Sequence, residues 1–184
     1  ARELLLAAYF NSRNYDAAYE AIKLVPDPDN NVKMALQKIA YFRALEYFEA
    51  GDYDRALELF DVADANRYTA KYTALTKFWR AETRADAFNR LGDIAFAQRE
   101  YYKAIENYDK AISIGASGKD YARFQRAVML GLVDKYDRKV ESLIDIIGGG
   151  DSEYVDDAMY ELGRTYVRHE RFNEGANVLK RLVA

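Results

Sequence analysis

The sequence predicts an all-α protein, an α-solenoid of about five stacked helical hairpins, and three observations carry this prediction. Aromatic residues recur in one register along the 184 residues, at Tyr15, Tyr53, Tyr101, Tyr136 and Phe172. Apolar residues follow each of these aromatics seven and ten positions later, which is the spacing of one helix face. Only two prolines occur, both between residues 26 and 28, so little interrupts a helix.

Small residues mark the places where the two helices of each hairpin should cross. Three positions after the aromatics stand Ala18, Ala56, Ala104 and Gly175, and nine positions before them stand Ala44, Gly92, Ala127 and Gly163, with Leu6 in that place before the first aromatic. The fourth aromatic is instead followed by Lys139. A long side chain there is expected to wedge the hairpin open unless its stem reaches outward, so the fourth hairpin is predicted to be looser than the others.

Several short stretches repeat within this register. They are Arg90–Asp93, Tyr101–Ile105, Tyr108–Ile112, Leu162–Tyr166 and Gly51–Leu57. These stretches resemble tetratricopeptide repeats, which are helix-turn-helix units with a period of about 34 residues, and the resemblance covers nearly the whole chain. It implies a right-handed superhelix in which the first helix of each hairpin lines a concave groove that accepts peptides or helices.

The intervals between the aromatics place the hairpins along the chain. They are 38, 48, 35 and 36 residues, which predicts hairpins at about residues 1–26, 31–66, 85–115, 119–148 and 152–184 in a single array. The long second interval contains an extra helix, about residues 68–82, with no partner helix after it. Either this helix is an insertion, or residues between Glu82 and Ala85 are missing or form a rebuilt loop. The second alternative is preferred.

The two ends of the sequence suggest a larger protein. The chain begins at Ala1 rather than Met, and no polar capping helix follows Leu179 and Leu182 before it ends at Ala184. Solenoids need polar caps for solubility. We therefore expect a fragment of a longer array, or a chain that associates with a second copy through its C-terminal end.

Residue types that carry catalysis or bind metals are scarce. The chain has no Cys and a single histidine, His169, which argues against thiolate zinc sites and Cys–His nucleophile pairs. Gly115–Lys119 lacks the spacing of a phosphate-binding loop, and Asp27–Asn31 lacks the central glycine of a calcium loop. Asp156 and Asp157 are adjacent and point in different directions on a helix. We expect no enzyme activity, no cofactor and no metal.

The charge balance argues against a nucleic-acid partner. The net charge is −3, with 27 Lys and Arg interspersed among 30 Asp and Glu, whereas a nucleic-acid surface needs concentrated basic residues. No apolar run approaches the roughly 18 residues needed to cross a bilayer. The sequence therefore predicts a protein or peptide partner and no direct membrane insertion.

The resemblance also implies which side chains line the groove. These candidates are Tyr41, Leu45, Phe48, Asn89, Asp93, Phe96, Tyr121, Phe124, Val128, Asp157, Tyr160 and Arg164. Aromatic rings beside a few polar groups are typical of a peptide-binding surface. The alternative, given equal weight, is that neighbouring helices bury many of these rings. Relatives that bind chaperone C-termini use Lys and Asn where Tyr41, Leu45, Asn89 and Asp93 stand here, so that activity is not expected.

These observations favour a non-enzymatic scaffold that binds a peptide or protein partner in its groove. The alternative is a structural spacer or a self-associating array within a larger protein. The stretch Asp151–Gly163 resembles the entry to repeats of bacterial envelope tetratricopeptide proteins, although Glu153 stands where they have proline. This narrower resemblance favours the periplasm or outer membrane over the cytoplasm.

Overall fold

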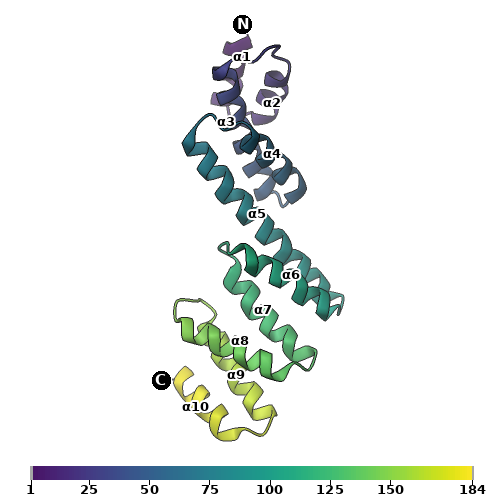
Figure 1. Cartoon of the computed structure of the whole chain (residues 1–184), viewed down its shortest axis with the longest axis vertical. Helices are drawn as coiled ribbons and strands as arrows, with labels where there is room; N and C mark the ends of the chain where they lie inside the picture. Colours follow the sequence, from purple (N-terminus) through teal and green to yellow (C-terminus); the bar gives the residue numbers. More distant parts are fainter. Residues whose placement is uncertain (1, 184) are drawn as a thin grey trace. The chain divides into compact units, whose positions relative to one another are not determined.

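The computed structural model describes the backbone of residues 2–183 and the side chains of residues 7–183 (Figure 1). The described chain consists of α-helices joined by turns, without strands, which confirms the all-α class. The helices are α1 (Arg2–Asn11), α2 (Tyr15–Lys23), α3 (Asn30–Glu49), α4 (Tyr53–Ala65), α5 (Ala70–Ala97), α6 (Tyr101–Ile114), α7 (Lys119–Leu132), α8 (Tyr136–Gly149), α9 (Val155–Arg168) and α10 (Phe172–Leu182). The side chain of Leu6 and residue Ala184, both used in the sequence argument, lie outside this description.

Each recurring aromatic is the first residue of the second helix of a hairpin. Helices pair as α1/α2, α3/α4, α5/α6, α7/α8 and α9/α10, and three residues join the helices of every pair. The turns therefore have one length throughout the chain, which explains why the aromatics share one register with the residues nine positions before them.

The five hairpin turns also share one backbone conformation. The middle residue of each has a positive φ, between 55° and 77°, at Arg13, Gly51, Arg99, Asp134 and Glu170. The amide of the next residue donates a hydrogen bond to the carbonyl five positions earlier, at 2.8–2.9 Å in every turn. This is the left-handed end of a helix known as the Schellman motif.

Close crossings occur where the small residues predict them. A Cβ atom on Gly92 of α5 would lie 2.5 Å from the ring of Tyr108 on α6, and one on Gly163 of α9 would lie 2.6 Å from Leu179 on α10. Ala44 of α3 and Ala56 of α4 are completely buried in one core cluster with Phe60. The hairpins are thus packed through their small residues.

The extra helix predicted at about residues 68–82 is not a separate helix. It is the first part of α5, which continues without interruption to Ala97 and becomes the first helix of the third hairpin. No glycine or proline lies between Glu82 and Ala85, and the alanine, arginine and glutamate side chains around this point are good helix formers. The predicted boundary was therefore wrong.

The chain forms two compact units whose boundary falls inside α5. Unit 1 is Ala1–Arg84 and unit 2 is Ala85–Ala184. Each unit has its own apolar clusters, around Tyr41 and Ile39 in unit 1 and around Tyr108 and Leu162 in unit 2. That the five hairpins form one continuous array stays a prediction.

Lys139 does not wedge the fourth hairpin open. Its side chain is only 6% exposed and crosses Gly131 of α7, where an added Cβ would lie 2.8 Å from Lys139 Cδ. Its ammonium group donates to Glu161 Oε1 of α9 at 2.5 Å. The side chain neither wedges the helices apart, as predicted, nor reaches outward, because a glycine on one neighbouring helix makes room and a carboxylate on another compensates the charge.

Among the helices described, none is long and apolar enough to pass through a bilayer.

Candidate functional site

In unit 1, a cavity of about 400 Å³ opens between α1 and α3, the first helices of the first two hairpins. We call it the α1/α3 cavity. Its lining is mostly apolar and includes Ala7, Phe10, Val32, Met34, Ala35 and Ile39. Asn11, Asn31 and Lys38 add amide and ammonium groups. This combination of apolar walls with a few polar groups is typical of a ligand site.

The residues predicted to line the groove on α3 lie next to this cavity on the same helix stripe. Tyr41 is only 4% exposed, and Leu45 and Phe48 are half-buried against the same core cluster. The first part of α5 covers this region, with ring centroids 5.5 Å apart for Tyr41 and Tyr72 and 5.4 Å apart for Phe48 and Trp79. Tyr41 is therefore a core residue, as the burial alternative stated.

Sequence reasoning missed the part of this stripe that lines the cavity. Met34 and Lys38 precede Tyr41 by seven and three residues, and both belong to the α1/α3 cavity. The stripe could have been extended backward along α3 from its helical spacing. What the sequence did not indicate is that α5 covers one end of the stripe and leaves the other end open.

A buried amide holds the start of α5 on α3. Gln37 is fully buried; its Oε1 accepts from the backbone N–H of Thr69 at 2.9 Å and from Thr69 Oγ1 at 2.8 Å. Its Nε2 donates to Thr73 Oγ1 at 3.0 Å. These bonds satisfy buried polar groups. Because Tyr72 lies between Thr69 and Thr73 in the sequence, the same bonds hold Tyr72 against α3.

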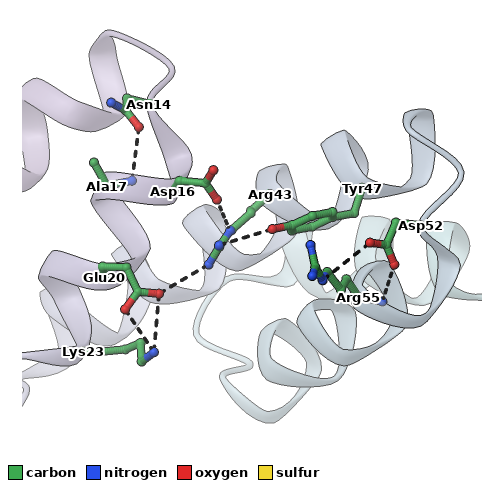
Figure 2. A network of polar contacts seen from close by, with 9 residues as sticks. All are labelled: Asn14, Asp16, Ala17, Glu20, Lys23, Arg43, Tyr47, Asp52 and Arg55. Carbon is green, nitrogen blue, oxygen red and sulfur yellow. Dashed lines mark hydrogen bonds and ion pairs between the residues drawn. The ribbon is translucent and has the colours of Figure 1, made fainter.

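A second cavity in unit 1, of about 490 Å³, lies beside a polar network on α2, α3 and α4. Figure 2 shows the network: Arg43 of α3 contacts Asp16 and Glu20 of α2, and its guanidinium donates to the Tyr47 hydroxyl at 3.4 Å. Two carboxylates thus balance the charge of Arg43, whose side chain is 15% exposed. These ion pairs join α2 to α3.

In unit 2, Asp93 of α5 connects two tyrosines rather than facing a ligand. Its Oδ1 accepts from the hydroxyl of Tyr108 at 2.8 Å and of Tyr121 at 2.5 Å. Burial, together with the neighbouring Asp93 carboxylate, raises the pKa of both tyrosines well above their ordinary value. Asn89, another predicted groove residue, is 4% exposed and donates to the Gly118 carbonyl at 3.2 Å. Asn89 is therefore structural.

The other predicted groove residues of unit 2 remain at least partly accessible. Phe124 of α7 is half-buried and stacks on Tyr154, with ring centroids 5.5 Å apart, and Val128 is half-buried. Phe96 and Tyr160 are 43% and 55% exposed. Arg164 and Asp157 on α9 are also exposed.

His169 lies at the end of α9, exposed, with its ring centroid 3.9 Å from that of Tyr136. The two rings line a small cavity of about 120 Å³ together with Lys139 and Thr165. Among the residues described as lining this small cavity, the one carboxylate is that of Asp134, and its side chain is exposed rather than buried. The described part of the chain contains no group of three or more potential metal ligands.

The helix pair α5/α6 contains the stretch of this chain that matches a known protein family. Residues 85–114, which hold the second part of α5 and all of α6, match the tetratricopeptide repeat family. Residues 85–114 therefore form a tetratricopeptide repeat. The matched residues include Gly92 and Tyr108 of the close helix crossing described above.

Solved structures with the same architecture are distant in sequence from this repeat protein. A crystal structure of MamA is 19% identical with a TM-score of 0.50, and the alignment covers 96% of this chain and 91% of that one. BtubC from P. vanneervenii is 17% identical with a TM-score of 0.50, covering 98% of this chain and 76% of that one. At such identities the likeness shows the fold alone. No curated protein sequence matches this chain significantly.

Proposed function

We propose that this repeat protein is a non-enzymatic scaffold that binds a peptide or protein segment on the faces of its first helices. The α1/α3 cavity is the observation that carries the proposal. Its volume of about 400 Å³ lies within the range of roughly 300–1,000 Å³ common for ligand sites. Apolar walls can bury side chains of a partner, while nearby amide groups can bond to its backbone.

Unit 2 contributes a second candidate surface to this proposal. This surface consists of Phe96, Tyr121, Phe124, Val128, Asp157, Tyr160 and Arg164. Asn89, which was also predicted to line the groove, is not included because it is buried. Aromatic and arginine side chains commonly carry the binding energy of interfaces. Each unit is proposed to bind through its own surface.

A peptide-display selection tests the proposal in unit 1. The full chain is immobilised and challenged with a random peptide library, in parallel with the Ala35→Arg variant, whose long side chain would fill the α1/α3 cavity. We expect enrichment on the original protein and loss of most of it on the variant. Ala176→Arg, the same change at an exposed position of α10, is the matched control and should retain the selected peptides.

Two results would decide against this site. If Ala35→Arg retains the selected peptides while circular dichroism shows an unchanged helix content, the peptides bind elsewhere. If no peptide is enriched by any of the three proteins, the scaffold proposal itself fails. A Phe124→Ala and Tyr160→Ala pair, assayed in the same way, tests the surface of unit 2.

A further inference from the structure

In unit 1, two stretches of an otherwise acidic protein carry basic residues and no acidic ones: residues 30–45 of α3 and residues 65–81, which include the first part of α5. Neither residues 30–45 nor residues 65–81 contain an Asp or a Glu, although the chain as a whole has a net charge of −3. Six acidic residues of this unit lie on α2 and α4, the second helices of the hairpins, and Glu46 and Glu49 lie near the C-terminal end of α3. Residues 30–45 and 65–81 therefore differ in charge from α2 and α4.

Three lysines of these two stretches lie over tyrosine rings. Lys33 Nζ is 5.9 Å from the centroid of Tyr68. Lys38 Nζ and Lys71 Nζ are 5.6 Å and 5.9 Å from the centroid of one ring, Tyr72. We call these five residues the lysine face. Cation–π contacts of this kind hold an ammonium group near an aromatic ring without neutralising its charge.

No ion pair joins any of these three lysines to a carboxylate of a described side chain. By contrast, Arg43 and Arg80 of the same unit each contact a carboxylate of α2 or α4. The lysine face is also continuous with the α1/α3 cavity, because Lys38 belongs to both. A ligand that enters the cavity therefore meets positive charge at the cavity edge.

We propose that the lysine face binds an acidic peptide segment whose bulky apolar side chain enters the α1/α3 cavity. This inference rests on the proposed function and adds the chemistry of the partner to it. A carboxylate two or three residues from the apolar anchor would reach Lys38 and Lys71, whose ammonium groups flank one ring. A nucleic acid fits less well, because the adjacent cavity is lined by Met34, Ala35 and Ile39 rather than by groups that contact phosphates.

Exposed ion pairs are individually weak, so the charge should shift affinity several-fold and should be sensitive to salt. The test uses two pools of synthetic peptides of equal length, passed over the immobilised full chain. The acidic pool combines Asp and Glu with Leu, Phe and Met, and the amide pool has Asn and Gln in place of the acids. Bound peptides are quantified by mass spectrometry at low and high salt, and single-stranded RNA serves as a third probe.

We expect about fivefold higher retention of the acidic pool at low salt. Lys38→Gln with Lys71→Gln should reduce that retention to the level of the amide pool and leave the amide pool unchanged. Lys103→Gln with Lys110→Gln on α6, which removes the same charge from exposed positions, is the control and should retain the preference.

Each contrary result has its own meaning. Equal retention of both pools would overturn the acidic preference and leave the scaffold proposal standing. Retention of neither pool would overturn both. RNA binding that is lost in the Lys38→Gln and Lys71→Gln variant, without retention of acidic peptides, would assign the lysine face to nucleic acid and overturn the inference.

Discussion

At the scale of single residues, the buried ion pair of unit 2 shows how a repeat position can change chemical type. Lys139 occupies a place that holds Ala18, Ala56 or Ala104 in other hairpins. Its burial is possible because Gly131 leaves room for the stem and Glu161 accepts a bond from the ammonium group at 2.5 Å. Three residues on three helices therefore depend on one another.

The two members of this ion pair should differ in how much their loss costs. Glu161→Gln leaves the buried Lys139 ammonium without its carboxylate, and we expect a loss of about 3 kcal/mol in the free energy of unfolding. Lys139→Met leaves Glu161 still bonded to Arg164, at 2.8 Å, so the loss should be about 1 kcal/mol. Urea denaturation followed by circular dichroism measures both, and equal losses would contradict the asymmetry.

The tyrosine pair on Asp93 predicts a loss of stability in alkali. The pKa values of Tyr108 and Tyr121 are raised in the folded protein by burial and by Asp93. Their contribution is therefore complete below the ordinary tyrosine pKa of about 10 and is lost as the pH rises above it. We expect the urea midpoint to fall between pH 9 and pH 11.

Replacing both tyrosines tests this origin of the pH dependence. In the double variant Tyr108→Phe, Tyr121→Phe, the urea midpoint at pH 8 should be lower than in the original protein, because two hydrogen bonds to Asp93 are lost. Between pH 8 and pH 11, however, the urea midpoint of the double variant should fall less than that of the original protein. Tyr102→Phe, at a residue that is 68% exposed, is the control and should keep the original slope. An unchanged slope in the double variant would refute the assignment.

At the scale of elements, the hairpin turns combine one conformation with different residues. The left-handed residue is glycine in one turn, Gly51, and carries a side chain in the other four. Left-handed backbone costs a residue with a Cβ roughly 1 kcal/mol more than glycine. The sequence offered little signal for these turns, because Arg13, Arg99 and Glu170 are not residues that usually indicate a left-handed turn.

Glycine at such a turn should therefore stabilise the protein. Arg99→Gly is expected to raise the free energy of unfolding by about 0.5–1 kcal/mol, since it removes strain at a φ of 62°. Gly51→Ala should lower it by about 1 kcal/mol for the opposite reason. Arg138→Gly, at an exposed position inside α8, is the matched control and should be destabilising by about 1 kcal/mol. Thermal denaturation compares the variants, and destabilisation by Arg99→Gly would disprove the strain argument.

The sequence periodicity predicted the helical hairpins correctly but not the boundaries of every helix. Five hairpins and their close crossings followed from the aromatic and small residues, because those patterns depend on neighbours within one hairpin. The helix boundary near Glu82 was predicted wrongly, because the register of the following hairpin was taken to require a new helix. Local propensity decides that question, and it favours continuing α5.

At the scale of the whole molecule, α5 is the element in which both compact units take part. Its 28 residues begin in unit 1 and end in unit 2. In unit 1 it covers Tyr41 and Phe48, and in unit 2 it packs Gly92 against Tyr108. One helix therefore serves two separate sets of packing contacts.

A proline at the unit boundary should break α5 locally. Arg84→Pro removes a backbone donor and clashes with the carbonyl of the preceding turn, at a cost of about 3 kcal/mol. We expect faster hydrogen exchange at residues 80–88, while amides in α4 and α7 stay protected because the core clusters of each unit are intact. Arg84→Ala is the control. Loss of protection throughout α7–α10 would show instead that unit 2 needs the continuous helix.

Whether a predicted groove residue is exposed or buried depends on which helices cover its stripe. The sequence placed Phe124, Tyr160 and Arg164 on accessible first helices, but it also placed Tyr41 and Asn89 there, which are buried. A stripe of apolar residues has the same spacing whether a neighbouring helix covers it or solvent does. Burial therefore could not be read from the spacing.

By itself, the sequence determined that this protein is a series of helical hairpins, where each aromatic and small residue recurs, and that its chemistry is poor in catalytic groups. These properties depend on spacing and composition within one hairpin. Only the tertiary structure decided that the first part of α5 covers Tyr41, that Lys139 points inward to Glu161, and that Lys38 lies over Tyr72 beside an open cavity. The contacts of Tyr41 with Tyr72, of Lys139 with Glu161 and of Lys38 with Tyr72 join residues more than 20 positions apart, which no local pattern specifies.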